Sequence, residues 1–298
     1  MNKTYKKSAI LYFIATLLIF SAFSCRKLVT DEFPDYDVQP VIYGLFKDAD
    51  VVRLHLSFTD KLQNASLNCI EDAFIVLSKN NIVFDTLQYH GEGFYLSRYK
   101  VFQGNRYGLN IQIPNYLPIS HTIEIPVAKK PNHIKFIESA GIDEDGQAYS
   151  GAVVDFKINP FLAEYHQIIV NSLDNGQLNP LRIYNINDPV LQSEGLNEAL
   201  FSTSNIKDPS YSMQINFQRT INSSVNPGQP TQYNPIIIEF RTVCKAYYQH
   251  HKQLILYNYG IEPDPFGHSL IPVQLYSNIQ GSFGVISSYS ACYSDTIF

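Results

Sequence analysis

The chain of 298 residues carries 22 Lys and Arg residues against 27 Asp and Glu residues, so its formal net charge is −5 at pH 7. Because nucleic-acid binding requires clustered Lys and Arg, this balance excludes nucleic acid as a partner. The length is sufficient for two domains of ordinary size.

The first 24 residues have the pattern of a secretory signal peptide. Lys3, Lys6 and Lys7 give a positive start, and the apolar run "AILYFIATLLIF" follows. A membrane-spanning helix, the alternative interpretation, needs about 20 apolar residues, and this run is shorter. We therefore predict that residues 1–24 are removed on export. The mature chain would then be more acidic, because lysines and no acidic residues are lost.

The end of this segment resembles the lipobox of bacterial lipoproteins. In "AFSC", Ser24 fits the small residue before the cut, whereas Ala22 departs from the usual leucine. The resemblance implies that Cys25 receives a lipid anchor and that residues 25–37 form a lipidated tether. Two or more acyl chains hold a protein on a membrane far more firmly than one. The alternative is ordinary cleavage nearby, which would leave Cys25 as a free thiol.

Residues 38–128 show the pattern of a β-sandwich. In "VVRLHLSFT" (residues 51–59) and "RYGLNIQIP" (residues 106–114), apolar residues alternate with polar ones, which is typical of half-buried strands. Further short apolar segments lie between them, separated by turn residues such as "KNN" and "HGEG". The segment "IPVAKKPNH" (residues 125–133) breaks the pattern. We interpret it as the junction to a second domain.

Residues 133–298 are predicted to form a second, β-rich domain with one helix. Strand-like segments include "AVVDFKINP", "YHQIIVNSL", "PIIIEFRTV", "PVQLYSNI" and "GSFGVISSYSA". The segment "CKAYYQHHKQLILYNYG" contains no proline and ends at Gly260, so it predicts a helix near residues 244–258. The fold class predicted for the whole chain is therefore all-β.

Three cysteines follow the lipobox: Cys69, Cys244 and Cys292. Their spacing is too wide for a zinc ribbon or a redox CxxC pair. An exported chain meets an oxidising compartment, and Cys244 and Cys292 lie in the same half of the chain, so we predict a disulfide between them. Cys69 is then unpaired and is expected to be buried.

Several motifs of the mature chain occur in the order in which a known family has them. They include Tyr247 and Tyr248 in the predicted helix, "PDPF" (residues 263–266) and "PVQLYSNIQGSFGVISSY" (residues 272–289), in which Ser282 replaces one glycine of the family's usual pair. Earlier in the chain, "AFIVLSKNN", "GEGFYLSRY" and "GNRYGLNIQI" also match. By these motifs nearly the whole mature chain resembles a Bacteroidota lipoprotein family catalogued as domain of unknown function 4249.

The resemblance implies a fold and a location. The N-terminal sandwich would be similar to immunoglobulin-like and carboxypeptidase regulatory domains. The family's members look like outer-membrane lipoproteins encoded beside TonB-dependent transporters, and no catalytic residue comes with the resemblance. It therefore implies a lipid-anchored protein of the outer membrane, with the cell surface favoured. The periplasmic face stays open, because Arg26 and Lys27 follow Cys25 where surface lipoproteins of this phylum often carry acids.

Motifs for catalysis or metal binding are incomplete. "GHSLI" (residues 267–271) lacks the second glycine of a nucleophile elbow. His250 and His251 are adjacent, and adjacent residues on a helix point about 100° apart, so they would not chelate one metal ion. "DEDG" (residues 143–146) begins like a calcium loop, but Val154 stands where the loop needs glutamate. We predict no enzyme activity, no metal and no cofactor.

Two functions are consistent with these patterns. The first is an accessory component of a TonB-dependent transporter that captures a substrate such as a glycan or a peptide. The second is a structural or adhesive surface protein without a role in transport. We predict partner contacts at Tyr276, Phe283 and Tyr289, because the closing segment is rich in residues that make adaptable contacts. Alternatively, "SNIQGSFG" forms only a tight connection, with Gly281 and Gly284 needed for backbone shape.

Overall fold

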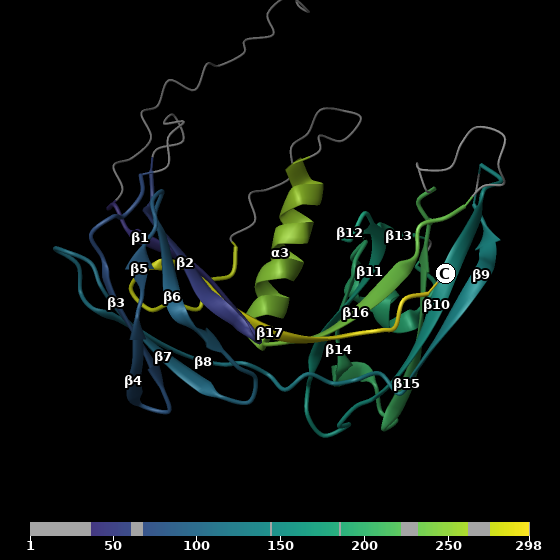
Figure 1. Ribbon diagram of the computed structural model, residues 1–298, viewed down its shortest axis with the longest axis horizontal. Helices are drawn as coiled ribbons and strands as arrows, with labels where there is room; N and C mark the ends of the chain where they lie inside the picture. Colours follow the sequence, from purple (N-terminus) through teal and green to yellow (C-terminus); the bar gives the residue numbers. More distant parts are fainter. Residues whose placement is uncertain are drawn as a thin grey trace, which may run out of the picture. The chain divides into compact units, whose positions relative to one another are not determined.

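The computed structural model (Figure 1) describes residues 37–60, 68–143, 145–184, 186–221, 232–261 and 275–297, with the backbone alone for residues 259–261. The chain divides into two units, Met1–Asp37 and Val38–Phe298. The fold described below is that of the second unit. The predicted signal peptide and the lipidation site at Cys25 lie outside the described residues.

The first part of this unit consists of short strands whose burial alternates as their sequence does. In β2, Val52, Leu54 and Leu56 are buried, whereas Arg53 is exposed and His55 half-buried. This alternation follows from the pleat, which sends successive side chains to opposite faces. The strands are β1 (Pro40–Lys47), β2 (Asp50–Phe58), β3 (Phe74–Lys79), β4 (Ile82–Thr86), β5 (Gln88–Tyr89), β6 (Phe94–Val101), β7 (Arg106–Gln112) and β8 (Ile119–Glu124).

The second part contains strands of two to eleven residues and the helices described in this unit. Its strands are β9 (His133–Ile142), β10 (Ala148–Lys157), β11 (Tyr165–Asp174), β12 (Gln177–Pro180), β13 (Ile183–Tyr184), β14 (Ala199–Ser202), β15 (Ser210–Phe217), β16 (Ile236–Val243) and β17 (Phe283–Tyr293). Its helices are α2 (Pro189–Glu194), the 3-10 turn η1 (Thr203–Asn205) and α3 (Lys245–Ile261).

One sheet joins strands from both parts. Its order is β12-β11-β16-β17-β1-β2-β6-β5, and β14 also pairs with β11. Strand β17 pairs parallel to β1 and antiparallel to β16, and Figure 1 shows β17, in yellow, beside both. The other two sheets have four strands each, in the orders β4-β3-β7-β8 and β13-β15-β10-β9.

Each four-stranded sheet packs on a different stretch of the long sheet. One core joins β1, β2 and β6 to β3, β7 and β8, with Phe46 and Tyr107 fully buried and Ile286 contributed by β17. A second core joins β11 and β16 to β10 and β15 around Phe156 and Phe240. The unit is therefore built as two sandwiches that share one sheet.

The predicted all-β class is confirmed, and the helix predicted near residues 244–258 is α3. Helix α2 was not predicted, although its sequence carries a start signal. The Asp188 side chain accepts hydrogen bonds from the backbone N–H groups of Val190 and Leu191, and a proline opens the helix. Both features are typical of helix N-termini.

The strand predicted at "PVQLYSNI" is not formed in residues 275–279, the part of it that the structure describes. The Asn278 side chain replaces strand pairing there. Its Nδ2 donates to the carbonyl of Ile286 (2.8 Å), and its Oδ1 accepts from the Ile286 N–H (3.0 Å). A side-chain amide thus holds this segment against β17, because it satisfies the same backbone groups that a ladder would.

The segment interpreted as a domain junction, residues 125–133, is anchored on both sides. The Ala128 N–H donates to Gln103 Oε1 (2.5 Å) in the first part. The Lys129 N–H donates to Thr242 Oγ1 (3.1 Å) in the second part. The predicted ranges 38–128 and 133–298 each hold one main core, but β17 inserts beside β1 in the same sheet. Their division into separate domains stays a prediction.

The same segment carries an ion pair that lowers the pKa of its carboxylate partner. Lys129 Nζ donates to both carboxylate oxygens of Glu164, and His166 Nε2 lies 3.7 Å from Glu164 Oε2. Burial alone would raise the pKa of Glu164, but His166 and the Lys129 ammonium outweigh it and lower the pKa to about 2. The carboxylate is therefore favoured in the folded state.

We expect this ion pair to make the unfolding free energy depend on pH. Because the folded pKa of Glu164 lies below its unfolded value, its contribution is present above about pH 5 and is lost as the pH falls toward about pH 2. With discounting for partial exposure we expect about 1–2 kcal/mol. Urea denaturation of Glu164→Gln across this range should show a shallower pH dependence than the wild type. Equal slopes in both proteins would contradict this, and Glu124→Gln, in an exposed ion pair, is the control.

Candidate functional site

Helix α3 lies on the face of the long sheet opposite to the second core, over a network of polar side chains. Arg241 and Glu239 are two residues apart on β16 and therefore share this face. Arg241 Nε donates to Glu239 Oε1 (2.7 Å) and Nη2 donates to Glu239 Oε2 (3.1 Å). The guanidinium carbon lies 4.5 Å from the centre of the Tyr289 ring, which adds a cation–π contact.

Tyr247 of α3 extends this network to β11. Its hydroxyl donates to Gln167 Oε1 (2.8 Å) and accepts from Arg241 Nη1 (3.2 Å). Burial raises the pKa of Tyr247 to about 12. The His251 ring stacks on the Tyr247 ring at 4.0 Å between centres, and burial, with the charges of His250 and Arg241, lowers the pKa of His251 to about 4. The network thus contains the Arg241 cation and the Glu239 anion, and its other side chains are neutral.

A second set of contacts fixes α3 beside α2. The Tyr248 hydroxyl and Lys252 Nζ each donate to Glu194 Oε2 at 2.6 Å. The Tyr248 ring lies 4.8 Å from the Tyr165 ring. Burial and the Glu194 carboxylate raise the pKa of Tyr248. These contacts hold the helix in one position on the sheet.

A cavity of about 460 Å³ opens next to this network, and we call it the Glu198 cavity. Gln167 Nε2 donates to Glu198 Oε2 (3.2 Å), so Gln167 connects the cavity to Tyr247 and Arg241. Burial raises the pKa of Glu198, against the opposing effects of Gln167 and Arg241. The lining consists of Gln167, Ile168, Ile169, Pro180, Leu181, Arg182, Ile183, Asn197, Glu198 and Ala199.

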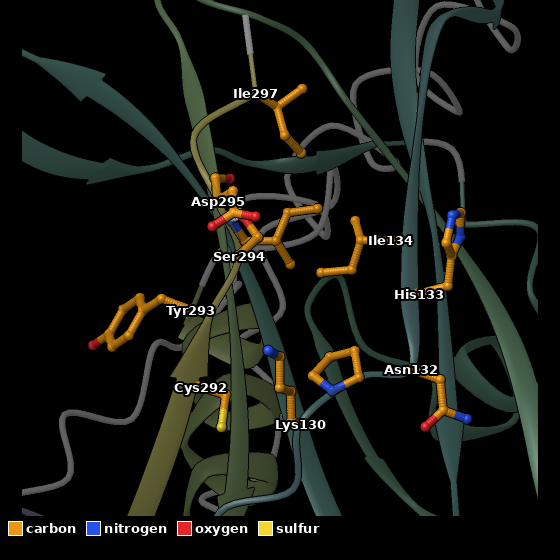
Figure 2. Close-up of a pocket in the computed structure, with 11 residues that line it drawn as sticks. Lys130, Asn132, His133, Ile134, Cys292, Tyr293, Ser294, Asp295 and Ile297 are labelled. Carbon is orange, nitrogen blue, oxygen red and sulfur yellow. Dashed lines mark hydrogen bonds between the residues drawn. The ribbon is translucent and has the colours of Figure 1, made fainter.

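A second hollow, of about 290 Å³, lies between residues 130–134 and residues 292–297. Figure 2 shows these two segments on opposite sides of it, with the Tyr293 ring pointing away. His133 Nδ1 lies 3.9 Å from Asp155 Oδ2, and Cys292 contributes a single thiol. Within the ranges that the structure describes, no group of three or more His, Cys, Asp or Glu side chains is arranged to hold a metal ion. The lining of this hollow is polar, with Lys130, His133 and Asp295 among its residues, but the hollow is smaller than the Glu198 cavity.

The predicted disulfide between Cys244 and Cys292 is not formed, and Cys69 is also a free, half-buried thiol. Cys244 follows β16, and its Sγ accepts from the N–H of Ser288 (3.2 Å), whereas Cys292 lies opposite Phe240 in the register. Four residues of β17 separate these points, about 13 Å at the rise of a strand. A disulfide requires Cα atoms within about 7 Å, so the register itself prevents the bond.

The three predicted partner contacts have different environments. Phe283 is 48% exposed, whereas Tyr289 is only 6% exposed. Tyr289 packs in a cluster with Val243 and Tyr247, so its role is structural and the prediction of a partner contact there was wrong. Tyr276 is half-buried, and its carbonyl lies 3.2 Å from His250 Nδ1.

Other sequence motifs have structural roles where they are described. Gly281 and Gly284 both have positive φ, 75° and 106°, which agrees with the backbone-shape alternative. Asp143 Oδ1 accepts from the N–H groups of Asp145 and Gln147, which closes a turn. The "GHSLI" motif at residues 267–271 lies outside the described residues.

Sequence reasoning named Tyr247 and His251 but missed the two charged residues of the polar network. In "PIIIEFRTV" two charged residues interrupt an apolar strand two positions apart, and this spacing places Glu239 and Arg241 on one face. The sequence therefore contained a signal for these two residues. Glu198 and Arg182 had no comparable signal, because only the pairing of β11 with β12 and β14 brings their segments together.

Comparison with known protein families identifies the family of this chain. A family model described as a domain of unknown function (DUF4249) matches residues 27–292. No curated protein matches the chain. In the part of the chain that the structure describes, no helix is long and apolar enough to cross a membrane.

Proposed function

The chain belongs to the family described as domain of unknown function DUF4249, and from this premise we propose that it is a lipid-anchored protein of the cell envelope. In this proposal it acts by binding, as an accessory component of a TonB-dependent outer-membrane transporter. The "AFSC" sequence supports attachment through Cys25. The resemblance to Bacteroidota lipoproteins supports the outer membrane as its location, with the cell surface favoured.

The observation that carries a role in binding is a row of exposed and half-buried rings across the long sheet. The register places Tyr43 opposite His55, and His55 opposite Phe94. Tyr43 is 42% exposed and Phe94 is 37% exposed, and Phe283 lies on the same face opposite Val41. We call Tyr43, His55, Phe94 and Phe283 the aromatic row. Exposed aromatic residues that gather on one face are typical of protein contacts.

The test is purification of the wild type from native outer membranes in mild detergent, with identification of the proteins that accompany it. We expect a TonB-dependent transporter to co-purify. Glutamine at Tyr43, Phe94 and Phe283 together should weaken co-purification about tenfold or more, since buried aromatic anchors dominate interface energies. The melting temperature should fall far less than for a core substitution, because none of these side chains is fully buried and each keeps part of its surface exposed. Phe161→Gln, also exposed, is the matched control.

Cys25→Ser separates the anchoring part of the proposal from the binding part. Without the acceptor thiol the protein should leave the membrane fraction for the soluble or unprocessed pool. A variant that matures normally and stays on the membrane would contradict lipidation. If no transporter accompanies the wild type, the transporter role is wrong and the adhesive alternative takes its place.

A further inference from the structure

The Glu198 cavity has aliphatic walls and two side chains of opposite charge. Ile169, Leu181 and Ile183 belong to its lining, and no aromatic ring is present among the lining residues. Sugar recognition commonly uses an aromatic ring as a stacking surface, so the lining does not favour a glycan. The volume, about 460 Å³, lies in the usual range for a small-ligand site.

Arg182 and Glu198 do not form an ion pair with each other. Across the described residues, the Arg182 side chain makes no hydrogen bond or ion pair, and the Glu198 carboxylate accepts a hydrogen bond from Gln167 alone. Arg182 is exposed, whereas Glu198 is half-buried. A ligand placed beside either side chain displaces water from its charge, which is unfavourable unless the ligand brings a group of opposite charge. A purely apolar ligand would offer no opposite charge to either side chain.

The carboxylate side of the cavity is held in place before any ligand arrives. Gln167 is buried, and it donates to Glu198 while accepting from Tyr247 and Arg241. Tyr247 in turn belongs to α3, which Glu194 fixes through Tyr248. A site whose polar groups are already oriented loses less entropy on binding.

We propose that the Glu198 cavity binds a short peptide with free termini, with its ammonium group at Glu198 and its carboxylate at Arg182. Both termini of such a peptide are charged near neutral pH. Its apolar side chains would contact the aliphatic walls. This inference names a ligand class for the capture that we proposed above, and in that respect it rests on the proposed function.

Calorimetric titration of the full chain in mild detergent with dileucine tests the cavity directly. The N-acetylated and C-amidated forms of dileucine each lack one terminal charge. We expect each blocked form to bind about tenfold to hundredfold more weakly, the usual effect of one charged hydrogen bond. Absence of measurable binding by dileucine, or equal binding of all three forms, would overturn the proposal.

Substitutions of Glu198 and Arg182 test which terminus of the peptide each side chain binds. Glu198→Gln should weaken dileucine binding, and this variant should bind dileucine and its N-acetylated form equally. Arg182→Gln should also weaken dileucine binding, and it should bind dileucine and its C-amidated form equally. Glu124→Gln and Arg106→Gln, which remove an exposed ion pair, are the matched controls and should bind as the wild type does. Full preference in both cavity variants would overturn the assignment. Co-purification of a transporter is measured separately, so either idea can fail while the other stands.

Discussion

Arg241→Met is expected to lower the free energy of unfolding by about 3–5 kcal/mol, because it leaves a buried carboxylate without its cation. Glu239 is only 5% exposed and accepts two hydrogen bonds from the Arg241 guanidinium. Methionine keeps most of the aliphatic stem, so the loss reports on charge more than on volume. Urea or guanidinium denaturation followed by circular dichroism measures it.

The double variant Arg241→Met with Glu239→Gln distinguishes the ion pair from simple packing. Removing both charges should recover a large part of the loss, since an unpaired buried charge is worse than none. Arg106→Met is the control, because its pair with Glu124 is exposed and should contribute about 0–1 kcal/mol. A double variant no more stable than Arg241→Met would contradict this account.

Gly284→Ala is expected to lower the free energy of unfolding by about 3 kcal/mol or more, through backbone strain and overpacking together. Gly284 has a φ of 106°, a region that L-residues rarely adopt. A Cβ atom built there would lie 2.0 Å from the carbonyl oxygen of Ile42 in β1. Because that oxygen belongs to the backbone, the clash is relieved only if β1 and β17 move apart.

The consequence should reach both sandwiches, since β17 lies between β1 and β16 in the shared sheet. Gly281→Ala is the matched control. Its φ is also positive, at 75°, but a Cβ atom there meets nothing within 4 Å. We expect it to lose only about 1 kcal/mol, the strain term alone. Equal losses in the two variants, measured by thermal denaturation, would show that the approach to Ile42 is unimportant.

The local pattern determined much of the fold. Alternating residues in 51–59 and 106–114 predicted β2 and β7, and a proline-free segment before Gly260 predicted α3. These features depend on periods of two residues and of a helical turn, which a sequence displays directly. Family membership likewise follows from motifs that lie in order along the chain.

Only the tertiary structure decided how distant segments meet. Tyr289 looked like a contact residue by composition, but the pairing of β17 with β16 buries it against Arg241. The same pairing separates Cys244 from Cys292, which sequence distance had suggested as partners. The physical reason is that composition and local period specify which face of a strand is apolar. They do not specify which strand lies beside it or in which register, because that choice depends on packing between residues far apart in the chain.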